Sequence, residues 1–315
     1  MIAFLVRRIG QSIVVLIGVS IIAFILEHLL PGGPAKAIIG PRATPIQIAA
    51  FNHQNGLDKP VVVQYFVYMW HLLQGNLGRS YKLNQTVNSI LIRTVPESIL
   101  LVGSALVFSL IIAIPIGIYQ AVKRNGIFDY TATSISFLLY SMPSFWLGII
   151  LILFLAVNVH FLPAEAPQGA NLGAILAHPS GLVLPILTLT LVSYASFSRY
   201  MRSSAIEALA QDWIRTAKAK GLSQRTILFK HMLRNALIPI ATLVGLSLPS
   251  LITAGVITES VFNFPGTGFV FINAANTEDY SLLLGIIIFV GVLTVVGNLI
   301  ADIAYAVLDP RVRYR

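Results

Sequence analysis

The sequence contains no cysteine, so disulfides and thiolate chemistry are excluded over its 315 residues. Charged residues are scarce as well, at 10% of the chain against about 25% in an average soluble domain. There is no G-x-x-x-x-G-K-[ST] loop, which excludes ATP binding by that route. H-E-x-x-H and G-x-S-x-G are also missing, and the histidines are scattered without metal-ligand spacing. An enzyme is therefore disfavoured, and we predict no metal or cofactor site in this chain.

Long apolar runs are what the chain has instead, and 56% of its residues are hydrophobic. A membrane-spanning helix needs about 20 apolar residues, and six runs reach or approach that length. They are Ile9–Leu30, Ser98–Tyr119, Thr131–Val157, Gly181–Phe197, Ala236–Ile257 and Leu282–Ala301. The sequence therefore predicts an all-α membrane protein with six transmembrane helices. We interpret the first run as a retained anchor, because it is too long for a signal peptide and no small-residue cleavage site follows it.

The net charge of +9 is distributed in a way that indicates membrane topology rather than nucleic-acid binding. Of the 21 Lys and Arg residues, 15 lie before the first run, between the second and third, within 199–234 or after the last run. The short loops 158–180 and 258–281 contain none. By the positive-inside rule, both termini are expected to be cytoplasmic. The other six lie in 31–97, a loop of a length at which the rule loses force.

The long segment 31–97 is predicted to be external and to contain a short helix. The apolar stretch Val61–Leu73 would be about 20 Å long as a helix, which is too short to span a membrane. Asp58 and Pro60 suit its start, and 74–80 is typical of turns. The segment is either a packed cap over the helices, which we favour, or a contact for an external delivery protein.

Prolines and hydroxyl groups within the apolar runs suggest where a path could open. Pro143 and Pro249 predict kinks that free backbone groups, although static packing explains any single proline equally well. The candidate path residues are Tyr140, Ser141, Pro143, Ser144, Ser193 and Thr253. Each is individually weak, because helix hydroxyls usually bond their own backbone.

Two other classes of protein are disfavoured by what the runs and loops contain. No ionisable residue lies in the middle of runs two to six, which argues against an ion-coupled secondary transporter. A receptor or binding module would need a large soluble domain, and 31–97 is small for one.

A basic, polar island between the fourth and fifth runs has the most informative pattern. One apolar face, made by Ile206, Leu209, Ala210, Trp213, Ile214 and Ala217, predicts an amphipathic helix over 206–220. Gly221 suits the left-handed end of that helix, and Ser223 suits the start of the next one. The island could be a solvated loop that only sets topology, a basic helix on anionic lipid, or a docking element for a soluble partner.

The order of residues in the island favours docking. Arg-Thr-Ala-Lys-Ala-Lys-Gly-Leu-Ser, followed by His-Met-Leu-Arg-Asn-Ala-Leu-Ile-Pro, resembles the coupling loop of ABC importer permeases of the dipeptide/oligopeptide/nickel group. Gly221 and Ala217 match the broader Glu-Ala-Ala-x-x-x-Gly pattern, whereas Arg215 and Thr216 replace its Glu-Ala. Pro-Ser-Phe-Trp-Leu-Gly at 143–148, the Glu-x-Val-Phe-x-x-Pro-Gly-x-Gly pattern at 259–268 and a later Asp-Tyr are similar to the same group. Near residue 33 the group usually has Pro-Gly-Asp-Pro, and here Gly33 replaces the Asp.

The resemblance covers nearly the whole chain and implies a type I ABC importer transmembrane domain for dipeptides or oligopeptides. Nickel chelates and glutathione are alternative cargoes of similar permeases. The implied partners are a homologous second permease, two ATPase subunits or domains that carry ATP and Mg, and an external substrate-binding protein. The implied location is the inner membrane of a bacterial or archaeal cell, within the lipid bilayer and without nucleic acid.

The resemblance also assigns residues and domains. The ATPase-docking residues would be Asp212, Arg215, Thr216, Ala217, Lys218 and Gly221. The residues in external contact would be Glu259, Pro265, Gly266, Gly268 and Asp279. The expected division is 1–97 for the first helix and external segment, 98–308 for a five-helix core with its coupling loop at 199–236, and 309–315 for a cytoplasmic tail.

Overall fold

The computed structural model describes residues 2–29, 35–36, 39–40, 42–80, 82–169, 171–247, 253 and 255–308, without the side chains of 2–6, 27 and 301–308. The Pro-Gly-Gly-Pro motif at 31–34, Pro249 and the tail at 309–315 therefore lie outside the described residues.

Long apolar helices dominate the described part, as the composition predicts. Five helical stretches are long and apolar enough to cross a membrane. They are α1 (Ile2–His28), α5 (Val87–Val122), α9 (Ser180–Leu209), the continuous run of α11 (Gln224–Thr226), η2 (Ile227–Met232) and α12 (Leu233–Ser247), and α15 (Tyr280–Leu308). A sixth span results only if α6 (Ile127–Ser141) is counted together with the helix formed by α7 (Ser144–Leu151) and η1 (Ile152–Asn158). The chain bends by 106° between α6 and that helix.

Several of the predicted runs differ from the structure in their limits, and the fourth, predicted at Gly181–Phe197, continues to Leu209 in α9. The second helix, α5, begins at Val87, before the predicted Ser98, because the helix continues into polar sequence capped by the Thr86 hydroxyl. The fifth run was predicted at Ala236–Ile257, but the helix covers 224–247 and includes basic residues that the hydropathy count excluded.

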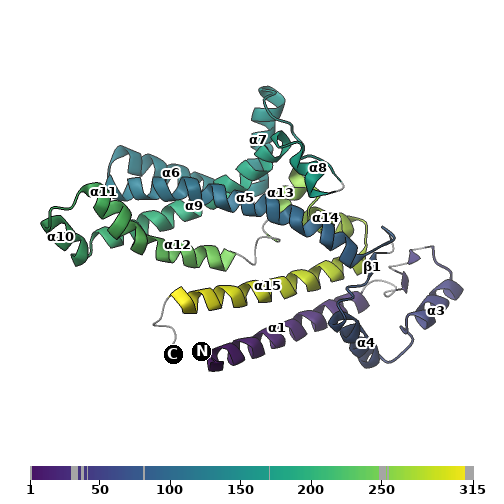
Figure 1. Ribbon diagram of the computed structural model, residues 1–315. Helices are drawn as coiled ribbons and strands as arrows, with labels where there is room; N and C mark the ends of the chain where they lie inside the picture. The colour runs from purple at the N-terminus through teal and green to yellow at the C-terminus, as the bar shows by residue number, and fades with distance from the viewer. Residues whose placement is uncertain are drawn as a thin grey trace.

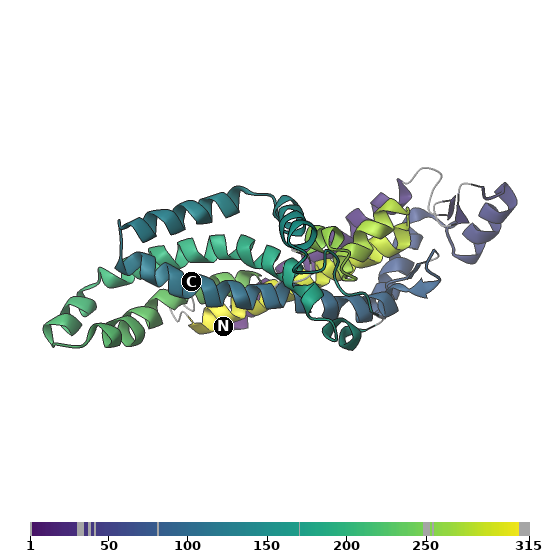
Figure 2. The same ribbon diagram turned by 90° about the horizontal axis from the view of Figure 1, so that it is seen from above.

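α9 is the central helix, since α5, α6 and α12 all pack against it (Figures 1 and 2). The contact with α5 is close at Gly117, where an added Cβ would lie 2.7 Å from the Met201 Cβ and 2.9 Å from the Ser198 carbonyl. A buried cluster joins α5, α9, α10 (Asp212–Ala219), η2 and α12, and it includes Met201, Ile214 and Met232. This cluster fixes one end of the bundle around α9.

α1 lies at the edge of the molecule, where it packs against α15 and α4 (Val61–Leu73). The Ser20 hydroxyl lies 2.9 Å from the Tyr65 hydroxyl, and His28 Nε2 lies 2.9 Å from Gln64 Oε1. The predicted helix over 61–73 is therefore confirmed, and it is held against α1 by side-chain hydrogen bonds.

The rest of the long segment lies beyond this contact (Figure 1). α3 (Pro45–Gln54) and α4 have no fully buried residues, but Tyr68 and Leu72 of α4 pack against the cluster of the buried Ala23 of α1. The packed cap over the helices stays a prediction. Asp58 does not cap α4; it pairs with His53 at 2.9 Å, and this hydrogen bond lowers the pKa of Asp58 below its ordinary value. Two-residue strands, β1 (Arg79–Ser80) and β2 (Gln85–Thr86), pair antiparallel and are a small departure from an all-α chain.

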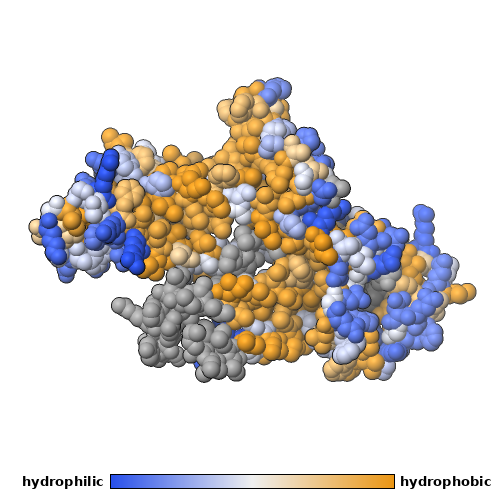
Figure 3. Space-filling view, in the orientation of Figure 1, coloured by the Kyte–Doolittle hydropathy of each residue, from blue (hydrophilic) through white to orange (hydrophobic). Residues whose placement is uncertain are grey.

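The remaining helices are short and lie between the long ones: α8 (Leu172–Leu176), α13 (Val256–Val261) and α14 (Thr267–Asn276). In the orientation of Figure 1, the surface in Figure 3 has an apolar band over its middle. Hydrophilic residues gather at the end that carries α10 and α11 and at the end that carries α3. The distribution is that of a protein whose middle lies in hydrocarbon.

Candidate functional site

The predicted docking helix is divided in two by the structure. Gln211 has extended backbone angles, φ −73° and ψ 150°, between the end of α9 and the start of α10. A continuous helix over 206–220 is therefore wrong. The corner allows Ala208 before it and Ile214 after it to reach the same buried cluster, which one straight helix leaving the bundle would not do. We call the corner and the two short helices after it, residues 208–226, the elbow.

α10 ends at a left-handed glycine, as the sequence predicts. Gly221 has φ +72°, and its N–H donates to the Lys218 carbonyl at 2.9 Å. The next N–H, from Leu222, donates to the Ala217 carbonyl at 3.3 Å, which completes a Schellman motif. Ser223 then caps α11 with its hydroxyl, which confirms the second predicted helix start.

The two faces of α10 have different surroundings. Ile214 and Ala217 are buried against the bundle, and docking by Ala217 stays a prediction. The opposite face is exposed, and its ion pair between Asp212 and Arg215, at 3.3 Å, leaves those side chains 93% and 79% exposed. Such an exposed pair is weak, and both groups are available to a partner. Docking by Asp212, Arg215, Thr216, Lys218 and Gly221 stays a prediction.

At the other end of the bundle, a buried carboxylate fastens three elements together. Glu259 of α13 accepts from the Ser98 hydroxyl of α5 at 2.7 Å. Its other oxygen accepts from the backbone N–H groups of Gly268 and Phe269 at 2.8 and 3.1 Å. The Ser98 hydroxyl in turn accepts from the Thr267 N–H at 2.8 Å. The first three N–H groups of α14 are thus all satisfied, and the carboxylate lies at the positive end of the helix.

We call this arrangement the glutamate clamp, and it explains the glycines of the Glu-to-Gly pattern. An added Cβ at Gly266 would collide with the Glu259 carboxylate, and one at Gly268 would collide with the Val256 backbone. At Gly255, an added Cβ would lie 2.9 Å from Glu259 Oε1. These positions lack side chains because the carboxylate and the α13 backbone occupy the space.

Asp279 has a comparable role at the start of α15. One oxygen accepts from the Leu282 N–H at 3.3 Å, and the other accepts from the Ser80 hydroxyl of β1. The Asp-Tyr pair therefore caps a long helix and ties it to the hairpin.

The residues predicted to make external contacts are thus internal. Glu259, Gly266, Gly268 and Asp279 are buried, and only Pro265 of that set is partly exposed. The Glu259 and Asp279 side chains and the two glycines shape the loops around α14 and α15, and an external contact by these residues stays a prediction.

The candidate path residues do not converge on one site. Tyr140, Ser141, Pro143 and Ser144 lie at the break between α6 and α7, where Pro143 immediately precedes α7. The Ser141 hydroxyl donates to its own helix at the Phe137 carbonyl, and Ser193 lies on α9. A path role for these residues stays a prediction, although the predicted distortion at Pro143 is confirmed as a break of 106°.

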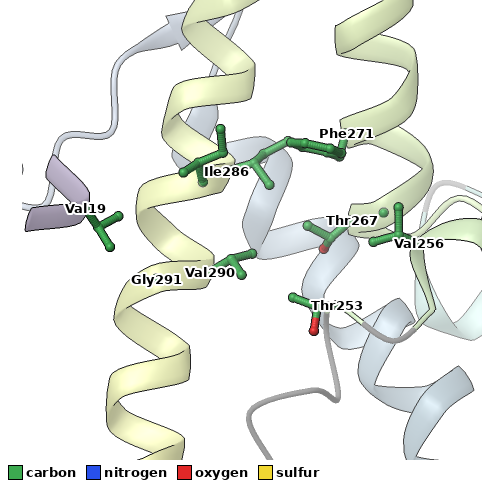
Figure 4. A pocket seen from close by; sticks show the side chains of 10 residues that line it. Val19, Thr253, Val256, Thr267, Phe271, Ile286, Val290 and Gly291 are labelled. Atoms are coloured by element: carbon green, nitrogen blue, oxygen red, sulfur yellow. The ribbon is translucent and has the colours of Figure 1, made fainter. Parts of the chain in front are cut away.

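Thr253 lines a cavity of about 330 Å³ between α1, α13, α14 and α15 (Figure 4). Phe271 and Ile286 face each other across it, and Val19 approaches from α1. The Thr267 hydroxyl, also in the lining, is 3.1 Å from the Thr94 hydroxyl. The cavity offers apolar surface and almost no polar group.

A buried ion pair near the elbow was missed by sequence reasoning. Arg202 Nε and Nη2 of α9 donate to the two oxygens of Asp129 in α6, at 2.6 and 2.7 Å. The Asn125 N–H also donates to this carboxylate at 2.9 Å. Asp129 is the lone carboxylate near the start of the third apolar run, and that isolation, opposite a basic island, is the signal that could have identified the pair.

Comparison with known proteins adds the decisive observation. A family model described as binding-protein-dependent transport system inner membrane component matches residues 113–314, and its N-terminal counterpart matches residues 1–102. The chain belongs to this permease family.

Among curated relatives, the oligopeptide transport system permease protein AppB of Bacillus subtilis is 37% identical over the full length of both chains. The oligopeptide transport system permease protein OppB of Haemophilus influenzae is 38% identical, and the dipeptide transport system permease protein DppB of Escherichia coli K12 is 32% identical. Both alignments also cover the whole of each chain.

The elbow and the glutamate clamp of this permease can both be placed on the family matches. The elbow lies within 113–314, whereas the clamp takes Ser98 from the N-terminal match and Glu259 from the other. The clamp therefore joins the two matched regions. The predicted domain division between 97 and 98 falls inside α5 and stays a prediction. With five or six candidate spans, the permease is a multi-pass inner-membrane component.

Proposed function

We propose that this permease forms, with a homologous second permease, the membrane path of an ATP-driven importer of dipeptides or oligopeptides. The observation that carries the proposal is sequence identity of 32–38%, over the full length of each chain, to relatives named for oligopeptide and dipeptide transport. The proposed assembly adds two ATPase subunits, which hold ATP and Mg, and an external substrate-binding protein. The proposed topology has six spans and cytoplasmic termini, in the inner membrane of a bacterium or archaeon.

The elbow is the element through which ATPase movement would reach the path. Ile214 holds α10 in the cluster that also contains Met201 of α9 and Met232 of η2. A push on the exposed face of α10 would therefore be transmitted to α9 and to the α12 helix together. Such coupling requires two states of the permease that the nucleotide-bound ATPase binds with different affinity.

Peptide uptake by cells that lack or carry the permease gene tests the function directly. We expect labelled dipeptide and tripeptide uptake to disappear on deletion, to return with the gene, and to stop when cellular ATP is depleted. Uptake of nickel chelate or glutathione, with no peptide uptake, would favour those cargoes. Peptide uptake that persists without ATP but depends on an ion gradient would favour a secondary transporter.

The orientation is tested with single introduced cysteines. The natural chain contains no cysteine, so it gives no background labelling. Lys82, between β1 and β2, and Lys220, just after α10, are both exposed. Figure 1 shows β1 and α10 toward opposite ends of the molecule. A membrane-impermeant thiol reagent should label Lys82→Cys in intact cells and Lys220→Cys only after permeabilisation. The reverse pattern would contradict cytoplasmic termini.

A further inference from the structure

Arg199 of α9 makes contacts that neither the proposed coupling through the elbow nor the glutamate clamp explains. Its guanidinium carbon lies 5.0 Å from the ring centroid of Phe137 and 5.0 Å from that of Tyr140, both on α6. Such cation–π contacts fix a guanidinium through the faces of the rings. One turn further along α9, Arg202 is paired with Asp129. Among the described residues, no carboxylate lies within ion-pair distance of Arg199, so its charge is oriented but not neutralised.

The Arg199 backbone follows the fourth apolar run, in the basic island, but its guanidinium lies against residues of the third apolar run. Phe137 and Tyr140 are six and nine residues beyond Thr131, where the third apolar run begins. At 1.5 Å per residue, these positions are about 9 and 14 Å into that run. The Cα–Cβ bond of a helical residue tilts toward the N-terminus of its helix, and for Arg199 that direction is away from the elbow. The side chain thus reaches toward the middle of the bundle.

An arginine at this depth cannot face lipid cheaply. Charged side chains inside a membrane face a protein interior or a water-filled cavity and mark the passage of ions or substrates. Tyr140 is 60% exposed, and Arg199 is exposed beside it, so both are open to whatever lies against this face of α6 and α9. Tyr140 and Ser141 are also predicted path residues at the α6–α7 break, next to Pro143.

We propose that Arg199, held between Phe137 and Tyr140, binds the terminal carboxylate of a peptide in transit. The inference rests on the proposed import of peptides and names a contact that the path makes with its cargo. Guanidinium N–H groups point outward in the plane of the guanidinium and match a carboxylate bidentately. The α-carboxylate is common to peptides of every sequence, so one arginine would serve a broad range of cargo. A lipid phosphate is disfavoured because head groups lie at the membrane surface, outside the hydrocarbon core.

The test compares one peptide with a free C-terminal carboxylate and the same peptide as a C-terminal amide. Uptake of each is measured at saturating concentration in the complete importer and normalised to permease level. Comparing the acid-to-amide ratio between variants cancels any preference of the delivery protein. The variants are Arg199→Gln, Arg199→Lys and the control Arg124→Gln, which removes an exposed charge from the turn before α6.

We expect Arg199→Gln to lower the acid-to-amide ratio about tenfold, because a charge-assisted bidentate contact is lost with the acid only. Arg199→Lys keeps the positive charge but lacks the planar guanidinium that binds a carboxylate bidentately, so it should lower the acid-to-amide ratio less. Arg124→Gln should leave the ratio unchanged. An equal loss of uptake for both peptides in Arg199→Gln would overturn the inference and indicate a carboxylate of the second permease as the partner. An unchanged ratio in both Arg199 variants would overturn it too. If the unaltered importer takes up neither peptide, the proposed function itself fails, and the inference falls with it.

Discussion

The clamp and the elbow fix opposite ends of the same bundle by different physical means. In the clamp, the buried Glu259 carboxylate satisfies one hydroxyl and two backbone N–H groups, and the motif residues face inward. In the elbow, apolar side chains such as Ile214 and a left-handed Gly221 set the geometry, and the charged residues face outward. The clamp is closed to partners, whereas the elbow presents unused charges to them.

This difference separates two roles that a sequence motif can have: setting a local shape and presenting a surface to a partner. Glu259, Gly266 and Gly268 of the pattern determine a shape, because losing the carboxylate orphans polar groups and adding a side chain at either glycine causes a collision. The residues on the outer face of α10 determine no local shape, because their one ion pair is exposed and weak. Changes in the clamp should therefore affect the stability of the permease, and changes on the elbow surface should affect its association with partners.

The largest effect is expected when the clamp loses its carboxylate. Glu259→Leu leaves two backbone N–H groups and the Ser98 hydroxyl without their acceptor in a buried site. At about 1–3 kcal/mol for each unsatisfied group, several kcal/mol of stability should be lost. We expect a lower unfolding temperature in detergent and a lower membrane level.

Glu259→Gln is the matched control for that change. Its amide oxygen can accept from Gly268 and Phe269, and its amide nitrogen can donate to the Ser98 oxygen. Stability should therefore be lost mainly in the leucine variant. If both variants unfold like the natural permease, the clamp does not hold the α13–α14 region.

A smaller effect on stability is expected at the elbow, and it should depend on which face of α10 is changed. Ile214→Ala opens a cavity in the buried cluster and should cost about 2–5 kcal/mol. Arg215→Ala, on the next residue, should cost almost nothing but weaken co-purification of the ATPase. The two measurements are unfolding temperature and the amount of ATPase recovered with the permease. Loss of stability in Arg215→Ala, with ATPase recovery intact, would remove the proposed difference between the two faces.

Much of the fold follows from hydropathy and from turn chemistry. The long helices α1, α5, α9 and α15 are apolar runs, and Gly221 and Ser223 are local signals that act within a few residues. Local rules therefore predicted these features correctly.

What the sequence did not predict depends on contacts between distant residues. Ala210 and Gln211 are good helix formers and interrupt no apolar stripe, so the corner between α9 and α10 arises from packing on the common cluster. Glu259 follows an apolar run and precedes Pro265 and Gly266, which is typical of an exposed turn. Its burial is set by Ser98, 161 residues away in sequence. The break at Pro143 was predicted as a kink, but its angle depends on where α7 packs.

A smaller loss of stability than that of Ile214→Ala is expected at Gly221, and there the elbow can be altered without touching any packed atom. An added Cβ would have no atom within 4 Å, so a substitution is strained only by the φ of +72°. Left-handed backbone costs roughly 1–2 kcal/mol for a residue with a Cβ, and a β-branched side chain fits it worst. Gly221→Val should therefore reach normal membrane levels but misdirect the chain between α10 and α11, with weaker ATPase association and strongly reduced uptake.

Replacing Gly221 by residues of graded left-handed tolerance distinguishes this account from a flexible loop. Asn adopts left-handed backbone more readily than other residues with a Cβ, so Gly221→Asn should stay near the natural uptake and Gly221→Ala should fall between Asn and Val. Uptake and recovered ATPase, each normalised to permease level, should decline in the order Asn, Ala, Val. A flexible solvated loop would give equal values for all three, because no defined angle would be lost. Equal values near the natural level would show that the fixed geometry of the elbow, unlike that of the clamp, contributes nothing to transport.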